Sequence, residues 1–501
     1  MADITVRLRH LAHPIERLMS IAGTPGVSIG VVTKDNPIIY DNYGFRDVER
    51  KLPVTEDTIF PICSLTKAIT AAALGLLVEE KKVSWDSLVK DVLPTFHSVD
   101  PIIHNHTTIS DILCHRTGMG WGDNLILGTA GNVLLRSEHV MKFINNRPLI
   151  RPFRAKFGYN NLNYEMVGSV IEQVSGQSYF DFLQSRLLDP LGMERTFFQT
   201  PSKSVDGVAV CYNALENAST VPIDFLRMGD DGYGAANGGA RSSVKDLVKL
   251  YSSYMKGFNS QFSETSASNE DSPLKQLNQI MSGKIPSDQP SQHEASYAYG
   301  WGRVQLPGRL GQIGLNPALL PNAWFCFIRE SLPGSLTFVA LLPEMETVIV
   351  VLTNSLALND AADWIGQLII EEIVNVPSEL RTDFTREGRK AGTSPKPLTE
   401  YVGTYWDDLQ IFKVEVRVLE DKLYWLMQGL ETERFKLTHY HEDTFTWLEA
   451  RDELASRGRW VGSDQDATFW KVEFGANESG KVRELIWVPD VELPPIIYTR
   501  S

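Results

Sequence analysis

The chain has 501 residues, which at roughly 100–200 residues per domain corresponds to two to four domains. Apolar residues make up 43% and charged residues 22%, the ordinary balance of a globular protein with a full core; a disordered chain, a collagen-like fibre and a small disulfide-stapled scaffold are excluded. The 48 basic and 62 acidic residues give a net charge of −14, which disfavours nucleic acid and anionic lipid as partners.

Cysteine usage and hydropathy predict a cytoplasmic protein. The four cysteines lie far apart and form no CxxC pair for zinc or redox work, so we expect buried, unbridged thiols. The N-terminal residues lack the apolar segment of a secretory signal. No run approaches the roughly 18 apolar residues that span a bilayer, so no membrane association is expected.

Residues 1–375 are predicted to form the first domain. An amphipathic helix over 4–22 precedes a two-stranded hairpin, and residues 64–80 are rich in alanine and leucine and almost uncharged, which is typical of a buried helix. Residues 259–296 are rich in Ser, Asn, Gln and Pro and are interpreted as a polar insertion. The hairpin strands at 27–32 and 38–40 are expected to share a sheet with strands at 304–306, 324–328, 336–342 and 347–352, followed by a helix at 360–374.

The end of the chain changes character. Residues 376–397 are polar and broken by three prolines, a linker composition, and 398–501 show short alternating segments separated by turn residues. This pattern predicts an all-β barrel or sandwich. Its strands are expected at residues 413–418, 422–427, 435–437, 444–448, 468–474 and 482–488.

Two motifs that suggest chemistry are set aside on their context. Residues 26–30 match the Gly-x-Ser-x-Gly nucleophile elbow, but the apolar strand continues past Ser28 where the elbow needs a helix. His104, His106, Asp111 and His115 invite a zinc interpretation, but their spacing fits no standard ligand set. We therefore predict no metal site.

A Ser-x-x-Lys tetrad is the stronger candidate. It occurs five times, at Ser64/Lys67, Ser87/Lys90, Ser242/Lys245, Ser253/Lys256 and Ser272/Lys275. Only Lys67 lies in an apolar and almost uncharged stretch, where desolvation lowers the pKa of a lysine toward the range of a general base. Three residues make about one helical turn, so the Lys67 amine reaches Ser64, which stands at the helix start where N–H groups favour an oxyanion. The alternative is a capping serine with a snorkelling lysine.

A Tyr-x-Asn motif at residues 159–161 supplies possible partners. Tyr159 and Asn161 stand at a turn that enters a predicted helix. A tyrosine near an ammonium is pushed toward phenolate and can take a serine proton, while the asparagine can bind a substrate carbonyl or hold the lysine.

The residues around these motifs resemble the penicillin-recognising serine hydrolases, the family of class C β-lactamases, D-aminopeptidases and esterases. The segments that carry the resemblance, over about residues 20–370, are 60–67, 108–119, 159–161, 238–243 and 299–302. Residues 401–405 resemble the opening of the β-barrel domain appended to many members, and the arrangement looks most like a fungal, intracellular branch. The resemblance implies an α/β (α+β) serine β-lactamase/DD-peptidase-like fold, an antiparallel sheet flanked by helices, with a lipocalin-like C-terminal barrel.

By this resemblance Ser64 is the nucleophile, Lys67 and Tyr159 share acid–base duty and Asn161 binds substrate. The family's third motif, Lys-Thr-Gly or His-x-Gly, aligns with residues 328–330, where this chain has Ile, Arg and Glu. Glu330 then stands where the family uses glycine against the substrate, and the N–H of Ser331 is the oxyanion donor that joins Ser64. Either this alignment of the third motif is out of register, or the protein has altered chemistry or a different substrate.

We therefore predict a serine acyl-enzyme hydrolase that acts on a small-molecule ester or amide without metal or organic cofactor. The alternatives are an acyltransferase (transesterase) of secondary-metabolite biosynthesis that uses an acyl acceptor, an isomerase or cyclase in which Lys67 and Tyr159 only move protons, and an inactive scaffold or binding module. The sequence leaves the oligomeric state open.

Overall fold

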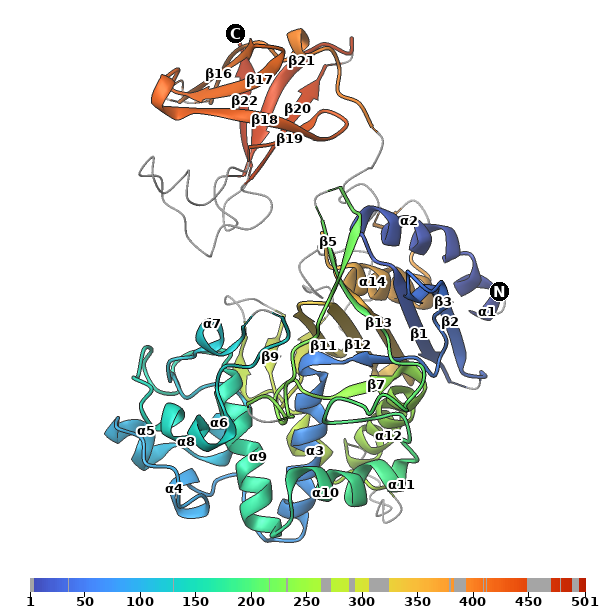
Figure 1. The fold of residues 1–501 in the computed structure, drawn as a ribbon, viewed down its shortest axis with the longest axis vertical. Helices are drawn as coiled ribbons and strands as arrows, with labels where there is room; N and C mark the ends of the chain where they lie inside the picture. Colours follow the sequence, from blue (N-terminus) through green and yellow to red (C-terminus); the bar gives the residue numbers. More distant parts are fainter. Residues whose placement is uncertain are drawn as a thin grey trace. The chain divides into compact units, whose positions relative to one another are not determined.

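Apolar strands and two groups of helices build the larger part of the molecule, described here from a computed structural model (Figure 1). The chain divides into two compact units, Met1–Thr385 and Arg386–Ser501. The described residues are 4–34, 36–128, 130–215, 217–230, 233–262, 272–287, 293–305, 324–377, 380–382, 393–408, 410, 412–447, 470–477, 479–488 and 495–501.

A nine-stranded antiparallel sheet forms the centre of the first unit, with strand order β3-β2-β1-β13-β12-β11-β10-β9-β8. The hairpin strands pair with the late strands through β1 and β13, as expected for one sheet. The bounds are β1 Gly26–Val32, β2 Ile39–Asp47, β3 Leu52–Pro53, β8 Ile285–Pro286, β9 Ala295–Tyr297, β10 Gly302–Gln305, β11 Trp324–Leu332, β12 Ser335–Leu342 and β13 Thr347–Thr353.

The sheet separates two hydrophobic cores because successive side chains of a strand point to opposite faces. On β12, Phe338 and Ala340 join the core beneath α2 (Ala12–Ala22) and α14 (Ala361–Ile373). Val339 and Leu341 join the larger core on the other face, where α3 (Thr66–Glu79), α9 (Asn161–Ser175) and α12 (Val244–Phe262) pack. Every residue of β12 is buried, which is why this strand is apolar apart from Ser335 and Thr337 and does not alternate between apolar and polar residues.

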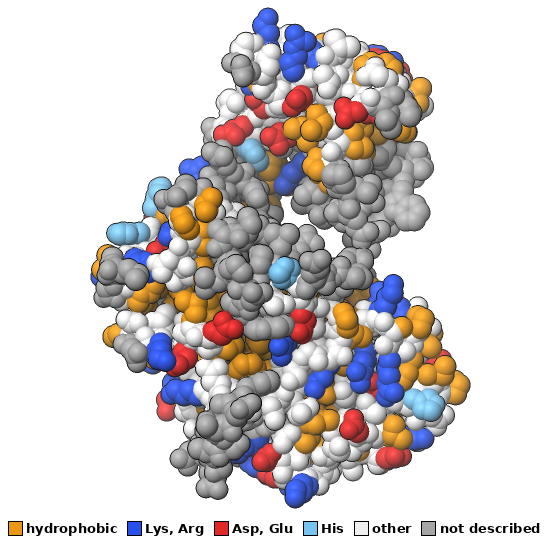
Figure 2. All heavy atoms as spheres, turned by 180° about the vertical axis from the view of Figure 1, so that it is seen from behind, with side chains coloured by type: hydrophobic (Ala, Val, Ile, Leu, Met, Phe, Trp, Pro, Cys, Tyr) orange, Lys and Arg blue, Asp and Glu red, His pale blue; other side chains and the backbone are white. Residues whose placement is uncertain are grey.

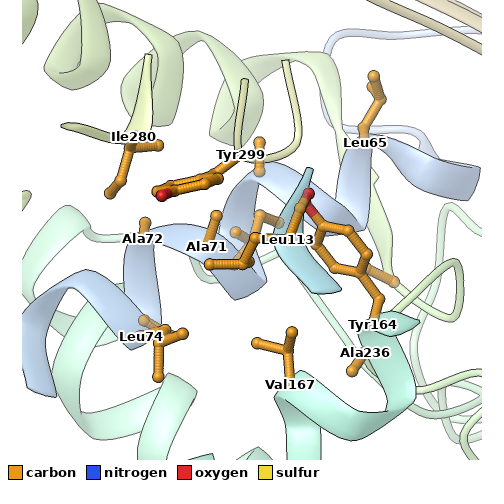
Figure 3. Close-up of a cluster of buried hydrophobic side chains, with 14 of the residues drawn as sticks. Leu65, Ala71, Ala72, Leu74, Leu113, Tyr164, Val167, Ala236, Ile280 and Tyr299 are labelled. Carbon is orange, nitrogen blue, oxygen red and sulfur yellow. The ribbon is translucent and has the colours of Figure 1, made fainter. Parts of the chain in front are cut away.

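Helix α3 (Thr66–Glu79) lies in the middle of the larger core, preceded by the 3-10 turn η1 (Cys63–Leu65). Its small side chains let α9 (Asn161–Ser175) approach closely, with Ala71 and Leu74 of α3 across from Val167 of α9 (Figure 3). A Cβ at Gly75 would lie 3.0 Å from the carbonyl oxygen of Lys275. The composition that predicted a buried helix thus reflects close packing on all sides.

The other helices and short strands surround these layers. The helices are α1 Ile4–Arg9, α4 Val89–Val92, α5 Pro101–His106, α6 Ile109–Leu113, α7 Asp123–Ile126, α8 Ser137–Asn145, α10 Tyr179–Leu183, η2 Gln184–Leu188, α11 Asp189–Leu191, α12 Val244–Phe262, α13 Leu277–Ile280 and η3 Pro343–Met345. The strands are β4 Ile59–Pro61, β5 Cys211–Ala214, β6 Thr220–Ile223, β7 Arg241–Ser243 and β14 Ser355–Leu356.

Two expectations differ from the structure in detail. The helix predicted over 4–22 is broken between α1 and α2, because Pro14 has no N–H to donate and its ring clashes with a helical carbonyl at His10. The range 259–296, interpreted as an insertion, contributes α13 and the edge strands β8 and β9; its residues 263–271 and 288–292 lie outside the described part.

The second unit contains a closed barrel of eight strands, β15 to β22. Its interior is filled with aromatic side chains, among them Trp425 and Trp447, whose ring centroids lie 5.2 Å apart. The sequence missed the first and last strands, which pair with each other and close the barrel. The elements are η5 Leu398–Glu400, β15 Gly403–Trp406, β16 Lys413–Leu419, β17 Lys422–Met427, η6 Glu431–Glu433, β18 Arg434–His441, β19 Thr444–Thr446, β20 Lys471–Ala476, β21 Val482–Trp487 and β22 Ile496–Arg500.

Acidic and basic side chains are intermixed on the face shown in Figure 2, so the negative net charge is not gathered there into one patch. Among the described residues, none of the helices combines the length and the hydropathy needed to cross a membrane.

Candidate active site

Ser64 lies in η1, at the junction between a strand and the buried helix α3. Strand β4 pairs with β7 and leads into the turn, and Cys63 adopts a left-handed backbone with φ of 49°. Such a conformation is costly for a residue with a side chain and persists only where its surroundings hold it. Thr66 fixes the turn, since its hydroxyl donates to the Cys63 carbonyl at 2.6 Å and accepts from the Ala240 N–H at 3.2 Å.

Lys67 points back over Ser64 as the spacing predicted. Its Nζ donates to Ser64 Oγ at 2.6 Å and to the carbonyl oxygen of Asn237 at 2.8 Å. The lysine is 1% exposed, so it does not snorkel to water, and the Ser64 hydroxyl makes no capping bond to α3. The alternative of a capping serine with a solvated lysine is therefore wrong.

Tyr159 completes a triad of side chains. Its hydroxyl donates to Ser64 Oγ at 2.8 Å, and Lys67 Nζ lies 4.8 Å from the centre of its ring. Residues 95 positions apart in the sequence thus meet on one oxygen atom. A hydroxyl in contact with an amine and a phenol can pass its proton to either one, which is what a serine nucleophile requires.

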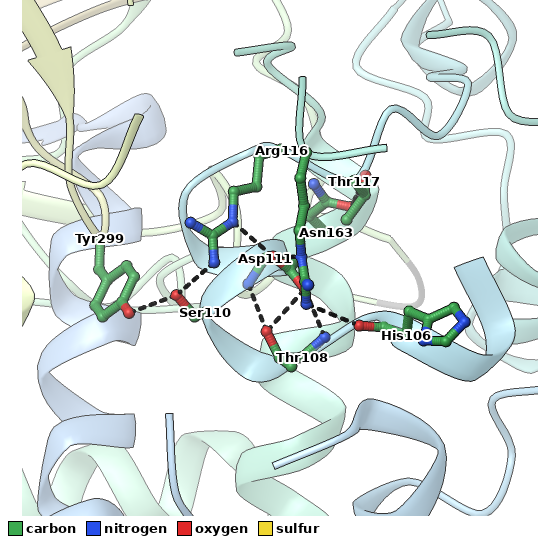
Figure 4. Close-up of polar contacts among 9 residues, drawn as sticks. His106, Thr108, Ser110, Asp111, Arg116, Thr117, Asn163 and Tyr299 are labelled. Atoms are coloured by element: carbon green, nitrogen blue, oxygen red, sulfur yellow. Dashed lines mark hydrogen bonds and ion pairs between the residues drawn. The ribbon is translucent and has the colours of Figure 1, made fainter. Parts of the chain in front are cut away.

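The segment 108–119 contacts Tyr159 through His115 and is itself held by a network of ion pairs and hydrogen bonds. Asp111 is fully buried and binds both Arg116, at 2.6 Å, and Arg154, at 2.7 Å, while Thr108 caps the helix α6 (Figure 4). Because both arginines and the cap hydrogen bonds stabilise the carboxylate, the pKa of Asp111 is lowered despite burial. Asp111 is thus engaged by arginines rather than by the histidines once considered with it as zinc ligands.

His115 follows this network and packs against the tyrosine. Its ring centroid lies 4.5 Å from that of Tyr159, and its Nδ1 accepts the N–H of Asn160 at 3.2 Å. Complete burial, together with the nearby charge of Lys67, holds the pKa of His115 well below its ordinary value. The imidazole is therefore neutral and serves as a wall for the Tyr159 ring.

Asn161 opens helix α9 beside the triad. The preceding Asn160 caps that helix by accepting a hydrogen bond from the Leu162 N–H. The side chain of Asn161 is partly exposed. Its Nδ2 donates to Asp123 at 3.0 Å, and its Oδ1 accepts no hydrogen bond within the described part of the chain. Tyr233 also donates to Asp123, at 3.0 Å, so a carboxylate lies next to the predicted substrate-binding amide.

The third motif lies on β11, which packs beside η1. Ile328 is buried in the larger core, so this position carries no basic side chain. Residue 330 pairs with Thr337 and Ser331 with Leu336; the side chain of Ser331 is exposed, and that of Glu330 lies outside the described residues. The aligned strand therefore lies beside the nucleophile, with the altered residues on it.

The other sequence candidates lie elsewhere. Ser28 is fully buried in the middle of β1, where its hydroxyl donates to Asn42 at 2.7 Å, so it is no nucleophile elbow. In two further Ser-x-x-Lys tetrads the lysine binds a residue outside the tetrad: Lys90 donates to an asparagine, and Lys245 forms an ion pair with Asp57.

Sequence reasoning gave no part in the proposed serine chemistry to four residues that the structure brings to the site. They are His115, Asp123, Asn237 and Glu165, whose carboxylate accepts from the Asn237 side chain. His115 stands inside the segment 108–119 that carries the resemblance, and that signal could have marked it. Asn237 contributes a backbone carbonyl, which leaves no mark in the sequence.

Comparison with known proteins gives the family. Residues 11–371 match the family model described as Beta-lactamase, which is more than half of the chain. The chain belongs to the β-lactamase family. Residues 387–496 match a second family model, described as a domain of unknown function (DUF3471), over the range that contains the barrel.

Relatives of this β-lactamase-family chain include proteins named as hydrolases. Unguisins hydrolase ungD' of Aspergillus campestris is 26% identical over 61% of this chain and 58% of its own length. Protein flp of Staphylococcus aureus is 29% identical over 38% of each chain. This chain thus spans less than two thirds of these relatives; the family and the hydrolase names support an enzyme of the serine hydrolase type.

Solved structures confirm the predicted fold of this β-lactamase-family chain. The octameric penicillin-binding protein homologue from Pyrococcus abyssi matches with a TM-score of 0.63 and 22% identity, over 98% of this chain and 99% of that one. The class C β-lactamase from Rhodobacter sphaeroides matches with a TM-score of 0.57 and 20% identity, over 72% and 98%. At these identities the likeness concerns the fold.

Proposed function

We propose that this protein is a serine acyl-enzyme hydrolase of a small-molecule ester or amide, with Ser64 as the nucleophile. The observation that carries the proposal is the convergence of Lys67 Nζ and the Tyr159 hydroxyl on Ser64 Oγ, at 2.6 and 2.8 Å. Both groups are within the distance at which a general base takes a proton.

The reaction proceeds in two steps. Ser64 Oγ bonds to the substrate carbonyl carbon while its proton passes to Lys67 or Tyr159; the carbon–oxygen or carbon–nitrogen bond then breaks, and the leaving alcohol or amine takes that proton. Water then attacks the carbonyl carbon of the acyl-Ser64 ester and gives a proton to the same pair. The bond from that carbon to Ser64 Oγ breaks, the proton returns to Ser64 Oγ, and the acid is released. The N–H groups of Ser64 and Ser331 are proposed as oxyanion donors, and Asn161 as the amide that binds the substrate carbonyl.

Hydrolysis is favoured over acyl transfer by the relatives named as hydrolases. The name of the Aspergillus proteins gives unguisins as their substrate; we propose a compound with an ester or amide bond for this chain without extending that name to it. An acceptor alcohol or amine in place of water would make the protein an acyltransferase in secondary-metabolite biosynthesis. The four cysteines, all buried and unbridged, support the further proposal of a cytoplasmic enzyme.

Mass spectrometry of the intact protein after incubation with a fluorophosphonate tests the proposal. We expect one adduct per wild-type chain and none on Ser64→Ala, because the phosphonylated oxygen is removed. Ser28→Ala is the matched control, since it deletes another buried hydroxyl, and it should be labelled like the wild type.

Absence of any adduct on the wild type would overturn the acyl-enzyme and leave proton shuttling or scaffolding as the function. The products of an activated ester, measured with and without an added alcohol, separate hydrolysis from transfer. A free acid as the main product in both conditions supports the hydrolase, and an ester of the added alcohol as the main product would replace it with the acyltransferase.

A further inference from the structure

A carboxylate lies behind the triad, on the helix that begins with Asn161. Glu165 stands one turn further along α9, and its Oε1 accepts the Nδ2–H of Asn237 at 2.8 Å. The backbone N–H groups of Gly234 and Ala236 face the same carboxylate and lower its pKa. One side-chain hydrogen bond and two backbone N–H groups of the same stretch of chain thus face a single carboxylate, which helps to fix the course of the segment 233–239.

The same segment carries the acceptor for Lys67. The carbonyl oxygen of Asn237 accepts from Lys67 Nζ at 2.8 Å, so one residue connects the carboxylate with the amine. The segment contains three glycines and depends on such bonds for its conformation. It also packs tightly on α9, since a Cβ at Gly168 would lie 2.8 Å from the Cβ of Ala236.

We propose that Glu165 is a positioning residue of the proposed acyl-enzyme reaction: its ionised carboxylate holds Asn237, and through the Asn237 carbonyl it orients the Lys67 ammonium toward Ser64. The inference rests on the proposed function. An ammonium held in this place stabilises the phenolate form of Tyr159, which can then take the Ser64 proton. Protonation of Glu165 weakens the charged hydrogen bonds and releases the segment.

The charge of Glu165 changes in the physiological range. Desolvation raises its pKa to about 7, against the opposing effects of the hydrogen bonds and of Lys67. The titratable groups that face it are Lys67 from α3, Tyr179 from α10 and Tyr233 from the segment 233–239. Burial raises the pKa of both tyrosines above 10, so they stay neutral while Glu165 titrates.

The pH dependence of acylation tests this role. The two quantities to measure between pH 5 and 9 are kcat/KM for a neutral nitrophenyl ester and the rate of fluorophosphonate labelling. The wild type should lose about tenfold in both rates from pH 8 to pH 6, because a group with a pKa near 7 is then about one-tenth ionised. Glu165→Gln should lack this step and should react at least tenfold more slowly at pH 8, since the amide has one acceptor oxygen where the carboxylate has two.

A second variant tests the connecting bond. Asn237→Ala keeps the carbonyl that Lys67 uses but deletes the Nδ2–H through which Glu165 holds this residue, so the rate at pH 8 should fall and the acid limb should flatten, as in Glu165→Gln. Glu172→Gln is the matched control, because it makes the same chemical change on the exposed side of the same helix. The Glu172 carboxylate accepts from the Tyr179 N–H, and this variant should keep the wild-type pH profile.

The outcomes separate this inference from the proposed function. No labelling of the wild type overturns the acyl-enzyme itself. Labelling of Ser64 with an unchanged acid limb in Glu165→Gln, or the same loss in Glu172→Gln, overturns the role of Glu165 alone. Thermal unfolding shows whether each variant folds. If Glu165→Gln does not fold, the acid limb of Asn237→Ala decides: a flattened limb supports the role of Glu165, and an unchanged limb overturns it.

Discussion

Two carboxylates of the first unit show how surroundings determine the charge of a side chain. Asp111 is buried against two arginines and the cap of α6, which keep it ionised. Glu165 is met by neutral amide donors and by the charge of Lys67, and desolvation prevails. The first carboxylate therefore acts as a permanent structural charge, whereas the second can respond to pH.

Asp111→Asn should lower the free energy of unfolding by about 3 kcal/mol at pH 7, because it leaves Arg116 and Arg154 without their shared carboxylate. A carboxyl with a lowered pKa stabilises the fold above its unfolded pKa of about 4, and this contribution is lost as pH falls through the lowered value. The difference between variant and wild type, measured by urea unfolding, should thus shrink at low pH. Asp91→Asn, at an exposed position, should change little, and an equal loss there would contradict the assignment.

Among the elements, the turn 299–302 supports the nucleophile helix from the side. Gly300 has φ of +80°, and a Cβ there would lie 3.0 Å from both the carbonyl carbon and the oxygen of Lys67. A side chain at this position would meet backbone atoms that have little freedom to move, since α3 is buried on all sides. The glycine thus allows the turn to lie directly on the backbone of Lys67.

Gly300→Ala should slow the labelling of Ser64 by on the order of tenfold to a hundredfold, because a small displacement of Lys67 disturbs the geometry of the triad. Gly176→Ala is the control: its φ is +72°, but nothing lies within 4 Å of its Cβ position. Both variants should lose about 1–2 kcal/mol of stability from the left-handed backbone, measured by thermal unfolding. Equal labelling rates in the two would show that the contact with Lys67 is unimportant.

At the scale of the whole molecule, each unit has its own hydrophobic core. The end of the first unit is fastened to α14: Glu372 pairs with Arg7 at 2.9 Å and also with Arg381, and Glu371 accepts from Thr382. Two of these partners, Arg381 and Thr382, lie beyond the final helix of the first unit. The first unit therefore needs part of the segment that the composition marked as a linker.

A fragment that ends at residue 392 should remain folded and react with the fluorophosphonate, since it retains both cores of the first unit and these bonds. A fragment that ends at Val376 should unfold at a lower temperature, because the nearly buried Glu372 loses Arg381. Circular dichroism during heating measures both. Aggregation of the longer fragment would mean that the first unit depends on the barrel.

The sequence by itself determined the parts of this protein that are local. Ser64 and Lys67 meet because three residues make about one helical turn, and the uncharged run after them forms a helix because alanine and leucine favour one. The resemblance supplied Tyr159, and apolar alternation supplied the sheet and most of the barrel strands. Tertiary structure alone decided that the Asn237 carbonyl holds Lys67, that Glu165 stands behind it, and that His115 packs on Tyr159. These contacts join residues 44 to 170 positions apart through backbone atoms, ring faces and desolvation, none of which depends on the order of neighbouring residues.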